Sequence, residues 1–304
     1  MRLVAGTRGS ALALRQTHEV IAALRQTVSD LDIDVAIIKT KGDKILDVPL
    51  ARIGDKGLFV KELETAILRH EIDFAVHSMK DLPVEMPDGL CIAAVPERVD
   101  ASDVLITNGP RLLDLPSHAH IGTSSLRRRA QLHAYRTDLR ISDLRGNLDT
   151  RLRKLDEGEF DGIVLAYAGL HRMGWTDRIT EKLSPEVCLP AVGQGALAIQ
   201  TREDDRRLIE ILRVLDDRNS RQAVMAERSF LKALGGGCQV PIGALAQVTE
   251  DTLVLQGVVA NTDGGFLVRG EVKGNADDFS DIGQKLAERL LASGADEILG
   301  IVQP

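Results

Sequence analysis

Short apolar runs alternate with amphipathic segments along the first two thirds of this 304-residue chain. Runs of four or five apolar residues predict buried strands, and apolar positions that recur every three or four residues predict helices. Their alternation is typical of an α/β fold. The predicted strands are Arg2–Ala5, Val35–Lys39, Phe74–His77 and Cys91–Val95, then Val104–Thr107, His120–Gly122, Leu139–Ser142 and Gly162–Ala166; the predicted helices are Ala11–Arg25, Leu126–Tyr135 and Leu148–Leu155.

The elements form two successive series, which predict two similar α/β lobes. A short polar stretch, Pro96–Ser102, separates the series and suits a crossing between lobes. The glycine-punctuated segment Leu189–Ile199 is a second candidate crossing. Two crossings predict a hinged cleft between the lobes.

After about Asn219 the pattern changes to that of a small α+β domain. A predicted helix, Arg221–Leu234, is followed by strands at Ala244–Val248, Leu253–Ala260 and Phe266–Val272 and by a helix from about Asp281 to Ala292. The loop Asn261–Gly265 predicts a hairpin. The segment Gly42–Gly57 has no sustained period, so it predicts either a binding loop or a disordered segment.

The chain carries a net charge of −7, which argues against a polyanion partner for the molecule as a whole. The charge is uneven, because the window from Thr123 to Lys154 holds nine basic and three acidic residues, a net charge of +6. The rest of the chain therefore carries −13. A local anion site is compatible with this pattern, and a solvated helix face is the alternative.

Hydroxyl side chains and arginines occur together at two strand-to-helix turns. Thr7-Arg8-Gly9-Ser10 follows the first strand, with Ser10 as a candidate N-cap, and Gly122-Thr123-Ser124-Ser125-Leu126-Arg127-Arg128 repeats the arrangement. Helix N-termini offer free N–H donors to carboxylate or phosphate, and arginine adds bidentate pairing. Helix capping explains the serines equally well, but it does not explain the adjacent arginines.

A third candidate group is Arg145-Gly146-Asn147, with Arg151 one helical turn later. Because ligand sites form at the carboxyl ends of strands in open α/β sheets, these residues are expected to face the same site. The glycines form no Walker loop, and Gly193-Gln194-Gly195 lacks a third glycine, which disfavours a nucleotide ligand.

Asp81 follows the apolar run Phe74–His77 through Ser78-Met79-Lys80 and lies near the carboxyl end of a strand. A carboxylate there can exchange protons or stabilise a cation. A surface ion pair between Lys80 and Asp81 is the alternative. His77 is predicted to be a hydrogen-bonded strand residue and not a catalytic base.

The three cysteines are far apart, which predicts neither a disulfide framework nor a metal site. Cys91 and Cys188 have apolar neighbours and are predicted to be structural. Cys238 follows three glycines and precedes Gln239-Val240-Pro241, so its thiol is expected on an accessible loop. Covalent chemistry is therefore plausible there, although its kind does not follow from the spacing.

These motifs together resemble the porphobilinogen deaminase (hydroxymethylbilane synthase) family over almost the whole chain. Seven segments occur in the family's order: Thr7–Ser10, Lys56–Leu63, His77–Pro83, Gly122–Arg128, Leu144–Asn147, Pro190–Gly195 and Gly236–Pro241.

The resemblance implies a transferase that deaminates four porphobilinogen molecules and joins them head to tail into linear hydroxymethylbilane, in tetrapyrrole biosynthesis. It implies two lobes of the periplasmic-binding-protein type II kind, at residues 1–97 with 196–215 and at 101–191. A third α+β domain, at residues 218–304, carries the cofactor cysteine. Dipyrromethane, made from two substrate units, is the expected cofactor and is held on Cys238 through a thioether.

The resemblance also assigns site residues. Asp81 matches the carboxylate that assists proton transfer and stabilises pyrrole cations after ammonia has left. Phe59 and the Gly42–Gly57 loop correspond to a lid, with helix packing as the alternative for Phe59. The residues expected to bind cofactor, besides Cys238, are Ser78, Lys80, Thr123, Ser125, Arg127, Arg128, Arg145 and Gly146; those expected to bind substrate are Arg8, Ser10, Phe59, Arg151, Arg172 and Gln194.

One position departs from the family pattern, because Gly235 stands where an acidic residue often precedes the Gly-Gly-Cys segment. Two other functions are weighed: a non-catalytic small-anion-binding protein of the same two-lobed fold, and nucleic-acid binding through the basic window. The second is disfavoured because Tyr135 is the only aromatic residue there for base stacking. No apolar segment approaches about 18 residues, so the expectation is a cytoplasmic monomer that binds neither membrane nor nucleic acid.

Overall fold

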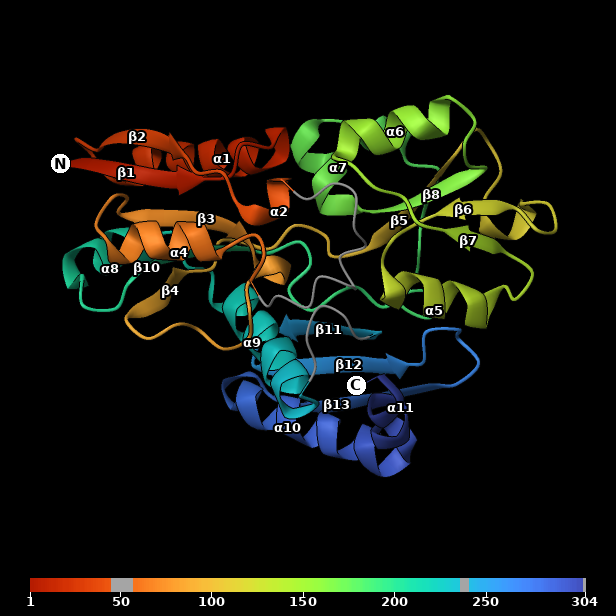
Figure 1. Cartoon of the computed structure of the whole chain (residues 1–304). Coiled ribbons are helices and arrows are strands. Elements are labelled where there is room, and N and C mark those ends of the chain that lie inside the picture. Colours follow the sequence, from red (N-terminus) through yellow and green to blue (C-terminus); the bar gives the residue numbers. More distant parts are fainter. Residues whose placement is uncertain (45–56, 236–240, 303–304) are drawn as a thin grey trace. The chain divides into compact units, whose positions relative to one another are not determined.

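The computed structural model describes residues 1–44, 57–235 and 241–302 (Figure 1). By its internal contacts the chain divides into two compact units. One unit contains Met1–Val99 and Ala196–Arg221, and the other contains Asp100–Gly195 and Gln222–Pro304. The hinged cleft predicted between the lobes stays a prediction.

The first unit is built on a five-stranded sheet with the order β2-β1-β3-β10-β4. Strand β1 pairs in parallel with β2 and β3, whereas β10 runs antiparallel between β3 and β4. The elements of this unit are β1 (Arg2–Thr7), α1 (Ala11–Thr27), β2 (Asp32–Ile37), α2 (Lys41–Lys44), α4 (Lys61–Leu68), β3 (Phe74–Ser78), the 3₁₀ turn η1 (Met79–Asp81), β4 (Leu90–Ala94), β10 (Leu197–Arg202) and α8 (Arg206–Arg213).

Helices cover both faces of this sheet. One apolar core joins Leu24 of α1 and Leu212 of α8 to the sheet residue Phe74, and another joins Leu63 of α4 to Ala75. Because both faces of the sheet are buried, its central strands consist of continuous apolar residues, and this pattern is recognisable in the sequence.

The second unit contains a five-stranded sheet with the order β7-β6-β8-β5-β9. Strand β6 pairs in parallel with β7 and β8, whereas β5 runs antiparallel between β8 and β9. Its elements are β5 (Asp103–Thr107), η2 (Leu112–Asp114), β6 (His120–Gly122), α5 (Leu126–Tyr135), β7 (Arg140–Ser142), α6 (Leu148–Asp156), β8 (Gly162–Ala166), α7 (Tyr167–Met173), η3 (Thr176–Arg178) and β9 (Glu181–Lys182).

The two sheets have the same topology. In each, three neighbouring strands are parallel, and the middle strand of the three comes first in the sequence. The fourth and fifth strands across the sheet then alternate in direction. In each sheet the fourth strand comes after a chain crossing, at Asp100 for β5 and at Ala196 for β10. The prediction of two similar α/β lobes is confirmed.

A three-stranded antiparallel sheet, β11-β12-β13, completes the second unit. Helices α9 and α10 cover it, and Phe230 and Leu286 contribute to the core between them. The predicted α+β character is confirmed. The elements are α9 (Arg218–Ala233), β11 (Ile242–Thr249), β12 (Thr252–Ala260), β13 (Leu267–Asn275), η4 (Ala276–Asp278), α10 (Phe279–Leu290), the π-helical segment η5 (Leu291–Ala295) and α11 (Asp296–Val302).

Two glycines shape this domain. A Cβ atom at Gly283 of α10 would lie 2.5 Å from the carbonyl oxygen of Ala226, so only glycine lets α10 approach α9 this closely. Gly294 has a φ of 100° and interrupts the helical path after α10, close to the predicted end of that helix.

The sequence prediction misplaced one strand, β2, and missed five short helices and the two-residue strand β9. Strand β2 covers Asp32–Ile37 and not Val35–Lys39, because an edge strand tolerates exposed Asp32 and Asp34 between its inward residues. Helices α2, α4, α7, α8 and α11 were not predicted. They are only four to eight residues long, which leaves too few turns for a clear period.

A buried polar chain crosses the sheet of the first unit. The ring Nε2 of His77 lies 2.9 Å from Oε1 of Gln200, and Gln200 donates from Nε2 to Oε1 of Glu64 over 3.2 Å. Burial lowers the pKa of His77 to about 4, and the nearby positive charge of Arg8 acts in the same direction. The structure therefore agrees with a hydrogen-bonded strand histidine.

This environment predicts a specific pH dependence of stability. Between pH 4 and 6.5 the unfolded chain binds a proton at His77 that the folded chain does not bind, so this residue contributes stability that is lost as the pH falls through that window. Replacing His77 with Gln removes the contribution. We expect acidification from pH 7 to pH 4 to cost the unmodified protein up to about 3 kcal/mol more than His77→Gln, measured by denaturant unfolding.

The matched control is His18→Gln, since His18 is exposed on α1. It should leave the pH dependence as it is in the unmodified protein. Parallel stability curves for the unmodified protein and His77→Gln would contradict the prediction.

Candidate active site

In the first unit, predicted site residues gather at the carboxyl edge of the parallel strands. Because β1 and β3 are parallel neighbours, the turn after β1 and the turn after β3 lie at the same edge of the sheet. The first turn holds Arg8 and Ser10, and the second holds Ser78, Lys80 and Asp81. The topology thus brings together residues that lie about seventy positions apart in sequence.

Asp81 ends the short 3₁₀ turn that follows β3. The turn is anchored by buried Met79, whose N–H donates to the carbonyl of Ala196 over 3.0 Å, and by the bond from the N–H of Leu82 to the carbonyl of Met79. The Asp81 carboxylate makes no hydrogen bond or ion pair to another residue within the described ranges, and the surface pair with Lys80 does not form. Rigid backbone therefore presents a partly exposed carboxylate.

The two serines of this edge already have partners. Ser10 is the N-cap of α1 and accepts from the N–H of Ala13 over 3.3 Å. The hydroxyl of Ser78 accepts from Nε2 of Gln16 over 2.9 Å. Capping of α1 by Ser10 is confirmed, and the binding roles predicted for both hydroxyls stay predictions.

Phe59 lies just before α4 with its ring between two other residues. The guanidinium carbon of Arg8 lies 4.2 Å from the ring centroid, a cation–π contact. On Gly42 the ring occupies the space that a side chain would fill. Phe59 thus contacts a predicted substrate-binding arginine, and it belongs to neither of the two described core clusters that join α1, α8 and α4 to the sheet. Most of the predicted lid, residues 45–56, lies outside the described residues.

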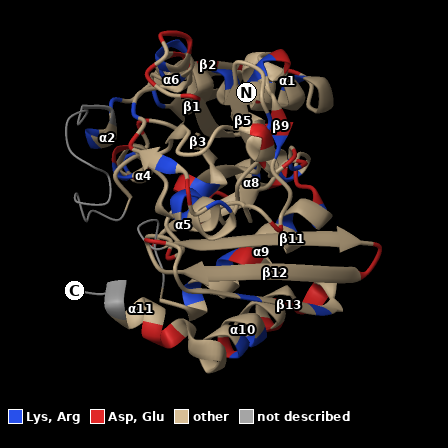
Figure 2. Cartoon of the chain, turned by 90° about the vertical axis from the view of Figure 1, so that its right-hand side faces the viewer, with Lys and Arg blue, Asp and Glu red and all other residues tan. Residues whose placement is uncertain are grey.

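In the second unit, parallel strands β6, β7 and β8 bring three further segments to one sheet edge. The Thr123–Ser125 turn follows β6, Arg145 and Gly146 follow β7, and α7 with Arg172 follows β8. Basic side chains mark α5, which starts from this edge (Figure 2).

The Thr123–Ser125 turn is tightly ordered. Ser125 caps α5 by accepting from the N–H of Arg128 over 3.4 Å, and Thr123 accepts from the N–H of Ser125 over 3.2 Å. The N–H of Thr123 donates to the carbonyl of Ser142 on β7. The helix therefore starts at a defined place beside the end of β7.

Arg127 and Arg128 are buried against Asp103, which the sequence analysis did not identify. Arg127 donates to Oδ2 of Asp103 over 2.6 Å, and Arg128 donates to Oδ1 from Nε over 2.9 Å and from Nη2 over 2.7 Å. Burial by itself would raise the pKa of the Asp103 carboxyl, but the two guanidinium groups hold it well below its usual range. Both arginines thus have a structural role, and their predicted contact with cofactor stays a prediction.

Arg151 lies near two other arginines. Burial, together with the positive charges of Arg128 and Arg145, lowers its pKa to about 10. Its Nε donates to the carbonyl of Gly146 over 2.8 Å, and Gly146 has a φ of 107°, which favours glycine. The Arg128, Arg145 and Arg151 group, here called the arginine cluster, is a site where bound carboxylates would relieve repulsion.

Arg172 and Gln194, both predicted to bind substrate, are buried. Arg172 donates to the carbonyl of Gly195 over 3.2 Å. Gln194 is 1% exposed and donates from Nε2 to the carbonyl of Ala101 and to Asp103. Gln194 thus joins the backbone at Ala101 to the Asp103 carboxylate, a structural role that the sequence did not indicate. Its binding of substrate stays a prediction.

The cysteines differ in environment. Cys188 is buried with a 3.4 Å contact from its thiol to Asp103, and burial raises its pKa to about 12, which suits a structural residue. Cys91 is half-buried, and burial raises its pKa as well. Cys238, the predicted cofactor attachment point, lies outside the described residues.

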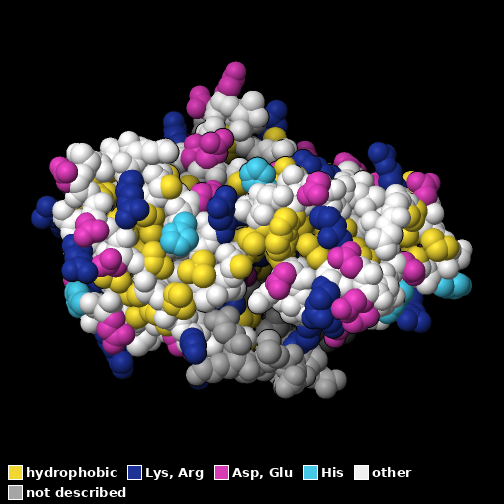
Figure 3. All heavy atoms as spheres, turned by 90° about the horizontal axis from the view of Figure 1, so that it is seen from above, with side chains coloured by type: hydrophobic (Ala, Val, Ile, Leu, Met, Phe, Trp, Pro, Cys, Tyr) yellow, Lys and Arg dark blue, Asp and Glu magenta, His cyan; other side chains and the backbone are white. Residues whose placement is uncertain are grey.

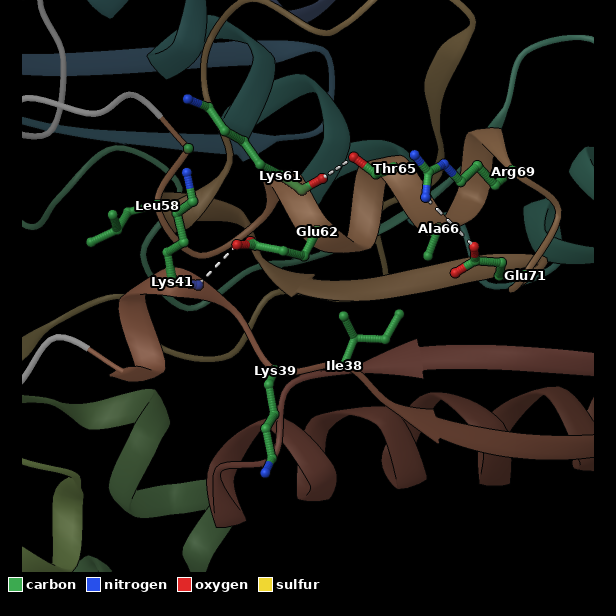
Figure 4. Close-up of a pocket in the computed structure, with 11 residues that line it drawn as sticks. Ile38, Lys39, Lys41, Leu58, Lys61, Glu62, Thr65, Ala66, Arg69 and Glu71 are labelled. Atoms are coloured by element: carbon green, nitrogen blue, oxygen red, sulfur yellow. Dashed lines mark hydrogen bonds and ion pairs between the residues drawn. The ribbon is translucent and has the colours of Figure 1, made fainter.

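A cavity of about 460 Å³ opens on the first unit beside α4 (Figure 4). None of the residues predicted to bind cofactor or substrate lines it, whereas Gly57, the last residue of the predicted lid, does. Its wall combines basic and acidic side chains, and Glu62 accepts from the backbone N–H of Lys41 over 2.9 Å. Its lining residues are Ile38, Lys39, Lys41, Gly57, Leu58, Lys61, Glu62, Thr65, Ala66, Arg69 and Glu71.

Figure 3 shows acidic and basic side chains interspersed over the face drawn there, with no broad region of one sign. Within residues 1–44, 57–235 and 241–302, no group of three or more His, Cys, Asp or Glu is placed to hold a metal ion.

Asp103 is the main residue that sequence reasoning missed. The signal available was indirect: two successive arginines at a helix start, in a segment whose apolar neighbours predict burial, require a buried acid. Which acid supplies it depends on β5 running antiparallel to β8, and this pairing is a tertiary feature.

Comparison with known proteins agrees with this geometry. Residues 3–210 match the family described as porphobilinogen deaminase, dipyromethane cofactor binding domain, and residues 221–292 match porphobilinogen deaminase, C-terminal domain. The chain is 54% identical to the porphobilinogen deaminase of Pelotomaculum thermopropionicum, over 98% of this chain and 96% of that protein. It is 54% identical to that of Desulforudis audaxviator, over 99% and 98%.

Among solved structures, the second substrate binding domain of a putative amino acid ABC transporter from Streptococcus pneumoniae aligns with 77% of this chain and 95% of that chain, at 13% identity and a TM-score of 0.44. The sequence matches cover nearly every described element of both units. The chain therefore belongs to the porphobilinogen deaminase family.

Proposed function

We propose that Asp81 is the catalytic carboxylate of the family reaction, in which four porphobilinogen molecules are deaminated and joined head to tail into linear hydroxymethylbilane. One observation carries this assignment: a carboxylate without a hydrogen bond or ion pair in the described part of the chain is held on the ordered turn after β3. Such a group is available to take up a proton from the substrate and to stabilise positive charge on a pyrrole nitrogen.

The arginine cluster binds the carboxylates of the substrate. Each porphobilinogen bears an acetate and a propionate group, so a growing chain of pyrroles accumulates negative charge. The mutual repulsion of Arg151, Arg145 and Arg128 falls when an anion lies among them, and guanidinium groups pair with carboxylates through two parallel hydrogen bonds. The cluster thus supports binding of a multiply carboxylated ligand.

The edge of the second unit that carries the arginine cluster also fits dipyrromethane, which has the same acid groups. Thr123, Ser125, Arg127, Arg128, Arg145 and Gly146 in the second unit and Ser78 and Lys80 in the first are the residues proposed to hold it. When attached to Cys238 through a thioether, the group primes the chain and remains after the product is released. The capped start of α5 adds backbone N–H donors for a carboxylate.

Residues of the first unit orient the incoming substrate. Arg8 supplies a positive charge for a carboxylate, and Ser10 lies at the N-terminus of α1, where anions are stabilised. Phe59 offers a ring face near Arg8 for stacking on a pyrrole. Arg172 and Gln194 complete the proposed substrate set.

The organisation proposed is two lobes, at residues 1–97 with 196–215 and at 101–191, and a cofactor domain at 218–304. The family matches support a division near residue 215, because one ends at residue 210 and the other begins at residue 221. In the described part of the chain, no helix is long and apolar enough to span a membrane. A monomer working in the cytoplasm, without nucleic-acid or membrane partners, completes the proposal.

We expect the dipyrromethane cofactor to be attached covalently. The intact mass of the denatured protein should exceed the sequence mass by one dipyrromethane. Cys238→Ser should lose this increment, and the control Cys91→Ser should keep it. An active protein of unmodified mass would exclude the mechanism, and an inactive one of unmodified mass would favour a non-catalytic anion-binding protein.

Removal of the Asp81 carboxylate should abolish chemistry without disturbing the fold. We expect Asp81→Ala to retain the dipyrromethane mass increment and the thermal unfolding midpoint, while turnover falls by about 10²- to 10⁴-fold, the usual contribution of a general acid or base. The control is Asp88→Asn, an exposed carboxylate in the turn before β4. Ordinary turnover in Asp81→Ala would remove Asp81 from the mechanism.

Loss of one arginine from the cluster should impair chain elongation. We expect Arg151→Leu to raise the KM for porphobilinogen by about tenfold or more, as for loss of a charge-assisted hydrogen bond, with addition intermediates detected by intact mass. The control is Arg153→Leu, since Arg153 is exposed on the same helix and pairs with Glu157. Identical kinetics in the two variants would refute a binding role for Arg151.

A further inference from the structure

One fully buried carboxylate of the second unit, that of Asp103, takes no direct part in the proposed chemistry. Asp103 is 0% exposed and begins β5. Because β5 runs antiparallel to β8, with Asp103 opposite Ala166, this first residue lies at the edge where β6, β7 and β8 end. The Asp103 carboxylate therefore lies at the same sheet edge as the segments that carry the arginine cluster.

Four side chains converge on this carboxylate. Oδ1 accepts from Nε and Nη2 of Arg128 and, over 2.9 Å, from Nε2 of Gln194. Oδ2 accepts from Nη1 of Arg127 and contacts the thiol of Cys188 at 3.4 Å. Both carboxylate oxygens are thus bonded, as the cost of burying a charge requires.

Three of the same side chains also bond to backbone carbonyls. Arg127 donates to Leu189 over 2.6 Å, Arg128 to Val164 over 2.9 Å, and Gln194 to Ala101 over 2.7 Å. The carboxylate therefore joins the start of α5 to β8 and to both segments by which the chain enters and leaves this lobe. Those segments lie close to the unit boundaries at Asp100 and Gly195.

Asp103 also controls charge near the cluster. It supplies one negative charge against the two positive charges of Arg127 and Arg128. Without it, two buried guanidinium groups would face each other with unsatisfied donors, a strongly unfavourable arrangement. Arg128 would then shift, and its backbone N–H is the group that Ser125 caps.

We propose that Asp103 is a positioning residue for the deaminase reaction. By fixing Arg127 and Arg128 at the start of α5, it holds the Thr123–Ser125 turn and the arginine cluster in the arrangement that binds the carboxylates of the growing pyrrole chain. This inference rests on the proposed binding function of the arginine cluster. Asp103 itself touches no ligand, because its oxygens are occupied within the unit.

The test compares Asp103→Asn and Asp103→Glu in the holoenzyme. Disordered arginines weaken the binding of substrate and transition state alike, so KM rises while kcat changes little. We expect Asp103→Asn to raise KM for porphobilinogen at least tenfold with kcat within threefold, and Asp103→Glu, which keeps the charge, to raise KM three- to tenfold. Should Asp103→Asn fail to fold, the KM of Asp103→Glu decides.

The control is Asp73→Asn in the first unit. Asp73 accepts from the N–H of Val4 and pairs with buried Arg202, but it contacts no residue of the arginine cluster. It should lower the unfolding midpoint with KM unchanged. An Asp103 variant that behaves in the same way would show a purely structural role and overturn the inference.

Arg151→Leu separates this inference from the proposed function. If Arg151→Leu raises KM and the Asp103 variants do not, only the positioning role of Asp103 fails. If Arg151→Leu leaves KM unchanged, the binding function of the cluster fails as well.

Discussion

One buried ion-pair group, Asp103 with Arg127 and Arg128, organises the second unit. Its carboxylate is inaccessible to water, and each of its oxygens is bonded. Removing one partner from a buried pair typically costs about 3–5 kcal/mol, because the other charge is left uncompensated. The start of α5, β8 and both crossing segments are therefore held together at the edge proposed to bind carboxylates.

The two α/β sheets place functional groups by the same rule. Parallel strands end at one edge, so residues distant in sequence lie at the same edge: Arg8 and Asp81 in one unit, and Thr123 and Arg145 in the other. The antiparallel fourth strand adds its first residue to that edge. In the second unit this residue is Asp103, which neutralises part of the positive charge that gathers there.

The arginines of the basic window therefore differ in role, although they look alike in the sequence. Arg127 and Arg128 are paired with an internal acid, and Arg136 is paired with Asp138. Arg151 instead lies near Arg128 and Arg145, and burial together with these like charges lowers its pKa. Pairs of opposite charge stabilise the fold, whereas like charges held close together are typical of a functional site, such as one that binds an anion.

Local sequence patterns determined the central strands, two helix starts and the family of this protein. Continuous apolar runs located the central strands, Ser10 and Ser125 marked the helix starts, and the segments around Asp81 and Cys238 carried the family. Each of these signals depends only on residues close together in the sequence, so it can be identified without the tertiary structure. Tertiary structure decided four other features. These are the ion pair of Arg127 with Asp103, the hydrogen bond from Gln194 to Asp103, the hydrogen-bonded chain from Glu64 to His77, and the position of the edge strand β2. Each depends on strand order or on burial, which bring together residues 24 to 136 positions apart.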